Sequence, residues 1–305
     1  MPYWSSTSNE EIGVRRETPT IIDIQKGFDR PELVTRDLTF QGFRARIDPF
    51  IVVSLFDMRG PVFPPHPHAG FSVATYIFPE SEIGFWNQDT LGNVNQIPPG
   101  ALHVTVAGAG VMYEETVTRS GRSATGLQIW MDHAAADREV APRGIHLAAG
   151  NVPTISAGGV TRRVLIGTSG GVVSPVDAPV SAKLTDADLA AGAIFREQVP
   201  EGETGFAIVR SGRVETPDGA AGPGSAVFAS DGVLELTARE AARLTFFGGR
   251  PMEHAFHPAG AFVASDETQA KAFRARYGAG GMGRLTPFDQ AALDRDFDAA
   301  GAVSG

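Results

Sequence analysis

Two histidines stand one residue apart in a short run that leads into an apolar stretch. Residues 65–70 read PHPHAG, so His66 and His68 are at positions i and i+2, and FSVATYI follows at once. On a β-strand, side chains at i and i+2 point to the same face. Two imidazoles on one inward face of a barrel can share a metal ion. The alternative is a polar turn with two unrelated histidines.

A second same-face pair follows a glycine-rich turn further along the chain. Residues 108–110 read GAG and predict a tight turn, after which Tyr113 and Glu115 are again separated by one residue. Glu115 offers either an oxygen ligand or a general base, and Tyr113 offers a phenol oxygen. We therefore take Glu115 and Tyr113 as candidate catalytic residues. The alternative is a strand whose tyrosine and glutamate face solvent.

The elements that position these residues are predicted to be short β-strands. Apolar runs rich in Val, Ile, Phe and Thr recur at close spacing and are separated by turn residues, first at residues 21–131 and again at residues 160–247. This pattern is typical of an all-β sandwich or barrel. The repetition predicts two β-rich domains, residues 1–148 and 149–305, with a linker near residues 148–157. The residues before the first strand are expected to form an arm or loop.

Two segments have the signals of helices. Residues 185–191 are short and alanine-rich, with Thr185 as a candidate N-cap and a glycine as the stop. Residues 265–277 open on Ser265 and Asp266, which are good N-cap residues, and end at a glycine. The tail around residues 288–297 is expected to pack against the surface or hang loose.

Composition narrows the classes of function. The chain has 305 residues, a formal net charge of −9 and no cysteine, so disulfides and cysteine-based metal sites are excluded. An acidic chain without a basic cluster disfavours nucleic-acid binding. No run approaches the length of a membrane span and no signal peptide is evident at the start, so the expected location is the cytoplasm, away from membranes.

Several motifs together resemble the pirin family. The first signature is similar to IDPF at residues 47–50, FPPHPHAGF at residues 63–71 and TY at residues 75–76. The second resembles the stretch from Pro99 to Glu115, and GLQIW at residues 126–130 is similar to the strand that closes the first pirin domain. GGRP at residues 248–251 and GAFV at residues 260–263 resemble the last strand and the segment before the final helix.

The resemblance implies two cupin-type (jelly-roll) β-sandwiches and a short C-terminal helix, with a metal, usually iron, in the first sandwich only. Pirin metal ligands are three histidines and one glutamate. Two of these histidines correspond to His66 and His68, and the glutamate corresponds to Glu115. The third histidine falls on Tyr113, and Ser72 stands where pirins usually have glutamate. The remaining two-histidine, one-carboxylate set matches the facial triad of non-haem iron oxygenases.

The remaining histidines are each given a separate interpretation. PPGALH at residues 98–103 places His103 at a spacing often met in the second cupin motif, so His103 either points inward as a replacement nitrogen ligand or is a hydrogen-bonded strand histidine. His133 and His146 are expected on loops after the last strand of the first domain. His254 and His257 are expected to be structural or solvated.

Three functions remain open. The first, which the resemblance implies, is an iron-dependent dioxygenase acting on a small aromatic substrate, a flavonol such as quercetin. The second is a non-catalytic regulator that binds a protein partner and carries a degenerate metal site. The third is a cupin that binds a small ligand without redox chemistry. Whether the protein binds a metal ion distinguishes the first function from the other two.

Overall fold

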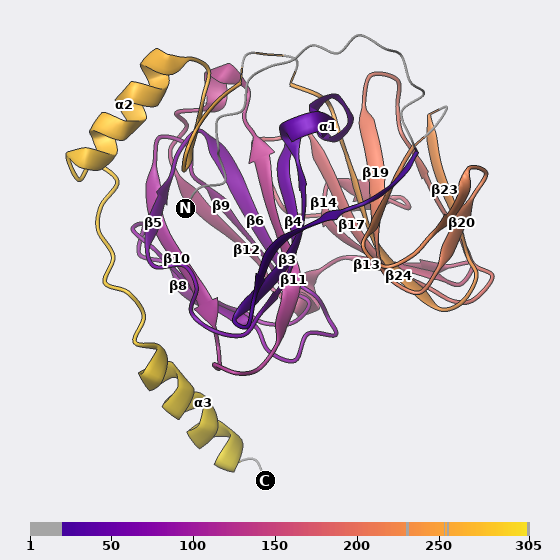
Figure 1. Ribbon diagram of the computed structural model, residues 1–305, viewed down its shortest axis with the longest axis horizontal. Helices are drawn as coiled ribbons and strands as arrows, with labels where there is room; N and C mark the ends of the chain where they lie inside the picture. The colour runs from indigo at the N-terminus through magenta and orange to yellow at the C-terminus, as the bar shows by residue number, and fades with distance from the viewer. Residues whose placement is uncertain (1–19, 230–231, 253, 255, 304–305) are drawn as a thin grey trace.

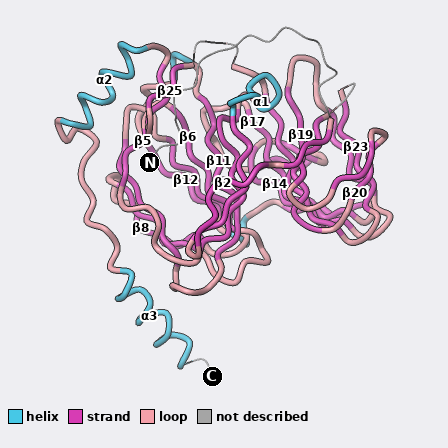
Figure 2. Tube along the Cα trace, viewed as in Figure 1, coloured by secondary structure: helices cyan, strands magenta, loops and turns pink. Residues whose placement is uncertain are grey.

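The computed structural model describes residues 20–229, 232–252, 254 and 256–303. Within these residues the chain forms two β-sandwiches side by side, with the helices at the periphery (Figures 1 and 2). The predicted arm at the start of the chain lies outside the described residues. The all-β, two-domain prediction is confirmed.

The first sandwich consists of a seven-stranded sheet and a four-stranded sheet, both antiparallel. In spatial order, the larger sheet contains β12 (Arg143–Leu147), β9 (Leu102–Val106), β6 (Phe71–Ile77), β11 (Ala124–Asp132), β4 (Phe50–Met58), β3 (Leu33–Thr39) and β2 (Gln25–Arg30). The smaller sheet contains β5 (His66–His68), β10 (Val111–Val117), β7 (Phe85–Asp89) and β8 (Val94–Ile97).

The second sandwich has the same division. Its larger sheet contains β1 (Ile21–Asp23), β22 (Ser225–Phe228), β19 (Thr204–Ser211), β24 (Ala242–Gly249), β17 (Ala182–Leu189), β14 (Val160–Ile166) and β13 (Thr154–Ala157). Its smaller sheet contains β18 (Ile194–Gln198), β23 (Val233–Ala238), β20 (Val214–Thr216) and β21 (Gly219–Ala221). A small hairpin, β15 (Thr168–Ser169) and β16 (Val172–Val173), lies beside it.

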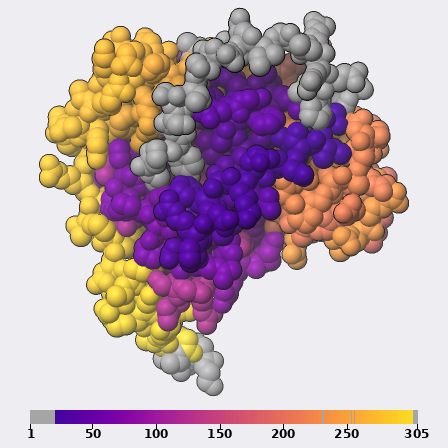
Figure 3. Space-filling view, in the orientation of Figure 1, coloured from indigo at the N-terminus to yellow at the C-terminus, as the bar shows by residue number. Residues whose placement is uncertain are grey.

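The N-terminal strand of the described chain joins the second sandwich, and a C-terminal hairpin contacts the first. Strand β1 pairs with β22, so residues 21–23 belong to the sheet of the second sandwich. The hairpin of β25 (His257–Ala259) and β26 (Phe262–Ala264) instead contacts the first sandwich, through a bridge between Ala69 and Phe262. Helices α2 (Glu267–Gly278) and α3 (Gln290–Val303) continue along the edge of the first sandwich (Figures 1 and 3).

The two larger sheets share one apolar core. Val53 and Leu127 of the first sandwich belong to the same buried cluster as Leu184 of the second. Phe50 packs edge-on against two rings of the second sandwich, Phe206 at 5.9 Å and Phe247 at 5.5 Å between centroids. Because this interface is continuous apolar packing, the two sandwiches are expected to unfold together.

A buried carboxylate ties the sandwiches together at one end of this interface. Asp186 on β17 has no exposed surface and accepts a hydrogen bond of 2.9 Å from the hydroxyl of Tyr76 on β6. Arg210 donates to Asp186 at 2.6 Å and also pairs with Glu80 of the first sandwich. A buried charge is tolerated only when it is paired and hydrogen-bonded in this way.

The helix predicted at residues 185–191 is wrong. Most of this segment lies in strand β17, which is paired on both sides, with β14 and β24. Its alanines and polar residues suggested a surface helix, but Thr185 and Asp186 are buried, and Asp186 is hydrogen-bonded by Tyr76 and Arg210 from other strands. The helix predicted from residue 265 is confirmed as α2, and Asp266 caps it by accepting from the backbone N–H of Gln269 at 2.8 Å. Helices α1 (Phe40–Ile47, irregular at Gln41 and Gly42) and α3 were not predicted.

The predicted linker is only partly a connection. After a single 3₁₀ turn (Ala149–Asn151), residues 154–157 form β13, which pairs with β14. Gly158 and Gly159 both have positive φ angles and form the hairpin turn between these strands, a role that favours glycine. The domain boundary near residue 148 stays a prediction. No helix in the described ranges is long and apolar enough to cross a membrane.

Replacing Arg210 with Met should lower the free energy of unfolding by about 3 kcal/mol, because buried Asp186 loses its main charged partner. Urea unfolding followed by circular dichroism measures the change. Arg239→Met is the matched control, since Arg239 pairs with Glu215 on the exposed surface and should change little. Equal effects of the two substitutions would contradict the buried-pair account.

Candidate functional site

Strands β5 and β10 bring the histidine pair and the tyrosine together. The register places Tyr113 directly opposite His66 and Val111 opposite His68. Ring centroids are 4.9 Å apart for His66 and His68, 4.6 Å for His66 and Tyr113, and 5.0 Å for His68 and Tyr113. His68 is only 2% exposed and also packs against Trp130 at 5.2 Å. The same-face geometry expected from the i, i+2 spacing is therefore present.

Backbone carbonyls fix the tautomer of both histidines. Nδ1 of His66 lies 2.8 Å from the carbonyl oxygen of Pro64, and Nδ1 of His68 lies 3.1 Å from that of Ala261. A carbonyl can only accept, so each Nδ1 carries the proton and each Nε2 carries the lone pair. Among the described residues, Nε2 of His68 is buried without a hydrogen-bond partner. This is the arrangement of a histidine that ligates a metal through Nε2.

Burial keeps both imidazoles neutral. Desolvation lowers the pKa of His66 and lowers that of His68 well below its ordinary value, with the neighbouring His66 adding to the effect on His68. The backbone hydrogen bonds oppose these shifts without cancelling them. Two neutral imidazoles are therefore present at neutral pH, as metal binding requires.

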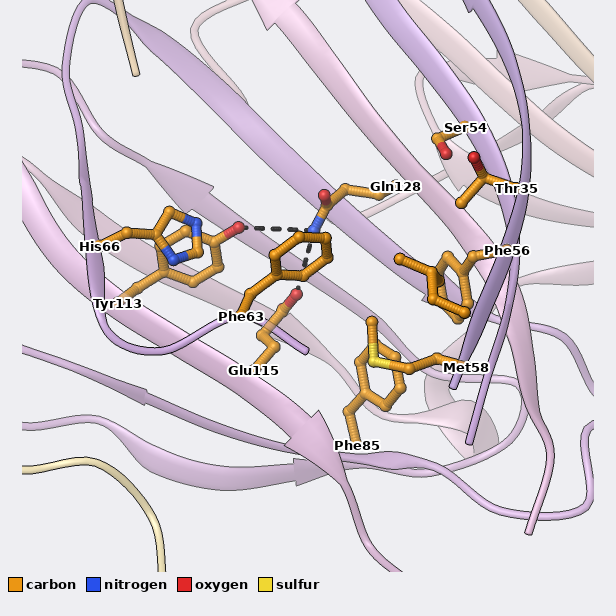
Figure 4. Close-up of a pocket in the computed structure, with 11 residues that line it drawn as sticks. Thr35, Ser54, Phe56, Met58, Phe63, His66, Phe85, Tyr113, Glu115 and Gln128 are labelled. Carbon is orange, nitrogen blue, oxygen red and sulfur yellow. Dashed lines mark hydrogen bonds between the residues drawn. The ribbon is translucent and has the colours of Figure 1, made fainter. Parts of the chain in front are cut away.

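Glu115 lies in the same pocket and is held by two neighbours. Its Oε2 accepts from the hydroxyl of Thr75 at 2.8 Å and from Nε2 of Gln128 at 3.3 Å. The same Nε2 of Gln128 lies 3.4 Å from the hydroxyl of Tyr113, so one amide connects the two candidate catalytic residues (Figure 4). Burial raises the pKa of Glu115 to about 7, against the opposing effect of these hydrogen bonds.

The pocket has apolar walls and little free space. Phe56, Met58 and Phe85 line the side away from His66 and Tyr113, and Phe63 lies beside Glu115 (Figure 4). Its cavity volume is about 20 Å³, room for one water-sized sphere. Pockets that enclose drug-sized ligands have volumes of roughly 300–1,000 Å³. A flavonol can therefore enter only if side chains such as Phe63 move aside.

The residues fit a metal ion held by two imidazoles. The unpartnered Nε2 of His68 and the shared tautomer of the pair support this fit. Across the part of the chain that the structure describes, no three His, Cys, Asp or Glu side chains gather closely enough to hold an ion. Glu115 is engaged with Thr75 and Gln128 instead. The complete ligand set of His66, His68 and Glu115 stays a prediction.

The other histidines lie elsewhere. His103 is buried on β9 beside Asn87 and is not among the residues that line the pocket. The prediction that His133 and His146 lie on loops is wrong for His146, which is part of β12. His133 is fully buried, and its Nε2 is 2.7 Å from the hydroxyl of Ser72. A histidine thus contacts the position where pirins usually have glutamate.

Three supporting groups were not predicted. Thr75 and Gln128 lie in stretches that resemble pirin motifs, TY at residues 75–76 and GLQIW at residues 126–130, but neither was assigned a role. The carbonyl of Ala261 comes from the β25–β26 hairpin, which buried Arg138 fastens by donating to the carbonyl of Gly70 at 2.9 Å and that of Val263 at 3.4 Å. Only the tertiary structure brings this hairpin to the site.

Two antiparallel sandwiches, with a histidine-bearing strand inside the first, define a two-domain cupin. Comparison with family models gives the narrower assignment: residues 33–131 match the model named Pirin, and residues 184–283 match the Pirin C-terminal cupin domain. The chain belongs to the pirin family.

Named relatives and solved structures agree with this assignment. Mouse (Mus musculus) pirin is 29% identical over 211 residues, covering 69% of this chain and 65% of its own length. This chain spans about half to two thirds of the length of curated relatives such as Arabidopsis thaliana pirin-like protein 2 and mouse pirin. A structure named quercetin 2,3-dioxygenase from Acinetobacter baumannii has a TM-score of 0.77 at 18% identity, covering 87% of this chain and 98% of its own. The bacterial pirin YhhW from Escherichia coli, in complex with nickel(II), has a TM-score of 0.60 at 17% identity, covering 76% and 99%. At these identities the two structures establish the fold.

Replacing Glu115 with Gln should stabilise the metal-free protein at pH 8 more than at pH 5. Because the folded-state pKa is raised, the folded protein keeps a proton that the unfolded chain releases, so stability falls as the pH rises from about 4.5 towards 7. The neutral glutamine removes a cost of up to ~3 kcal/mol at pH 8.

Urea unfolding at both pH values, with a chelator present, gives the difference between variant and wild type. Glu235→Gln, which alters an exposed carboxylate, is the control. A stability difference for Glu115→Gln that does not change between pH 5 and pH 8 would contradict the raised pKa.

Proposed function

We propose that this pirin is an iron-dependent dioxygenase that acts on a small aromatic substrate with adjacent oxygen atoms, a flavonol such as quercetin. His66, His68 and Glu115 are the proposed ligands. The observation that carries the proposal is the buried, unpartnered Nε2 of His68 beside His66 in the same tautomer. Iron, when bound, would supply the positions at which dioxygen and the substrate oxygens meet.

The protein side chains have separate tasks in this proposal. Besides its part as a ligand, Glu115 can accept the proton of a substrate hydroxyl. Its pKa of about 7 belongs to the metal-free protein, and a bound cation would lower it. Gln128 orients both Glu115 and the hydroxyl of Tyr113, which donates a hydrogen bond to a substrate oxygen. Phe63 and Phe85 offer faces against which an aromatic ring can pack once the pocket opens.

The similarity to the Acinetobacter baumannii structure named quercetin 2,3-dioxygenase supports this substrate class. The nickel(II) complex of the Escherichia coli pirin supports a divalent ion in a pirin fold. The narrow cavity sets a condition, because the side chains on its apolar wall must move before a three-ring substrate can enter.

Two measurements test the proposal. Elemental analysis of the purified, untagged protein determines the bound metal, and an oxygen electrode then measures dioxygen consumption with a panel of flavonols. We expect the iron-loaded protein to consume dioxygen with quercetin, and His66→Ala to lose both the pocket iron and the activity. His257→Ala is the matched control, since the His257 side chain is partly exposed and pairs with Glu267 away from the pocket. Iron-loaded protein that turns over no flavonol would sink the dioxygenase proposal.

A second candidate function is a regulator that binds a protein partner. Tyr113 in place of the third histidine and the small cavity favour it, because a binding protein can tolerate an incomplete metal site. Protein that contains no metal under any loading condition, and recovers one partner in stoichiometric amount from cell extract, would favour this function.

A further inference from the structure

A row of polar side chains crosses the interior of the first sandwich. The strand register pairs Gln128 with Thr75, Thr75 with His103, and His103 with His146. Directly opposite residues of antiparallel strands point to the same face of a sheet. Since Gln128 and Thr75 both contact Glu115, the row begins at the pocket and ends at the edge strand β12, where His146 is exposed.

Two imidazoles meet at the far end of this row. His103 on β9 and His146 on β12 are direct cross-strand partners, and their ring centroids are 5.9 Å apart. His103 is 2% exposed, whereas His146 is open to solvent. Cross-strand side chains at such positions have Cβ atoms about 5 Å apart, close enough for both rings to reach one ion.

One nitrogen of each ring lies within hydrogen-bonding distance of an asparagine side-chain amide, a different asparagine for each ring. Nε2 of His103 lies 3.4 Å from the amide of Asn87, Nδ1 of His146 lies 3.4 Å from that of Asn95, and the two amides are joined at 3.0 Å. Within the described residues, Nδ1 of His103 is buried with no hydrogen-bond partner, as is Oδ1 of Asn87. As placed, Nδ2 of each asparagine faces its ring. Turning both amides over lets their oxygens accept from the imidazoles and leaves lone pairs on the outer nitrogens, at the cost of the hydrogen bond of 3.2 Å that Nδ2 of Asn95 donates to the carbonyl of Gln96.

The charge state of the pair suits a cation. Burial lowers the pKa of His103 to about 4, with His146 adding to the shift and Asp89 opposing it, and burial also lowers the pKa of His146. Both rings are neutral at pH 7. Asp89 is buried nearby, and its carboxylate accepts from the backbone N–H groups of Leu91 at 2.8 Å and Asn93 at 3.0 Å. A neighbouring negative charge favours an incoming cation.

We propose that His103 and His146 form a second metal site, which binds a divalent transition-metal ion of the kind that imidazole prefers, such as Ni²⁺, Cu²⁺ or Zn²⁺. Asn87 and Asn95 orient the two rings, and water completes the coordination at the exposed edge. The site is separate from the pocket of His66 and His68, and it does not depend on the proposed oxygenase function.

Calorimetric titration with Ni²⁺ of untagged, chelator-treated protein at pH 7.5 tests the second site. We expect His146→Ala to bind one equivalent less than the wild type, whether or not the pocket binds nickel. His257→Ala is the control and should bind as the wild type does. Because His146 is exposed, its replacement is expected to leave the fold intact, and circular dichroism checks this.

A second set of variants distinguishes binding at this site from binding in the pocket of His66 and His68. The double variant His66→Ala/His68→Ala should still bind one equivalent, and adding His146→Ala should abolish that binding. Replacing Asn95 with Leu in the double variant should weaken the remaining binding at least about tenfold, because the ring loses its orienting partner. Equal nickel stoichiometry in the wild type and His146→Ala, or no binding in the double variant, would overturn the proposal.

Discussion

The hydrogen bond between Nδ1 of His68 and the carbonyl of Ala261 joins residues 193 positions apart, and the geometry of the pocket depends on it. It decides which nitrogen of His68 carries the lone pair, and it requires the β25–β26 hairpin to lie against β5. Gly70 permits that approach, because a Cβ atom there would lie 1.8 Å from the carbonyl oxygen of Val263. Arg138, fully buried, satisfies the carbonyls of the contact.

The interiors of the two sandwiches differ, and this difference locates the chemistry. The second sandwich is filled with apolar side chains such as Phe195, Leu236 and Phe246. The first contains a carboxylate, amides and imidazoles, whose burial costs free energy unless each finds a partner. Unpartnered atoms remain on both His68 and His103. Both proposed ligand sites therefore lie in the first sandwich.

Much of the architecture could be predicted, because period-two patterning and turn residues are local signals. The same reasoning predicted inward-facing positions for His66, His68, Tyr113 and Glu115. The rings of the first three have centroids within 5.0 Å of one another, and Glu115 lines a pocket together with His66 and Tyr113. It failed at residues 185–191, where a strand carries the polar residues of a surface helix, since the partners of Asp186 lie on other strands. Contacts made by distant segments leave no local trace in the sequence.

The exchange of chain ends has a consequence for synthesis. Proteins begin to fold from the N-terminal end while they are being made. Here the ribosome must complete the hairpin at residues 257–264 before His68 acquires its backbone partner, and β1 must wait for β22 before it can join a sheet. The first sandwich therefore emerges early but matures late, and a nascent chain stalled inside the second sandwich would carry a His68 that is not yet oriented to take up metal.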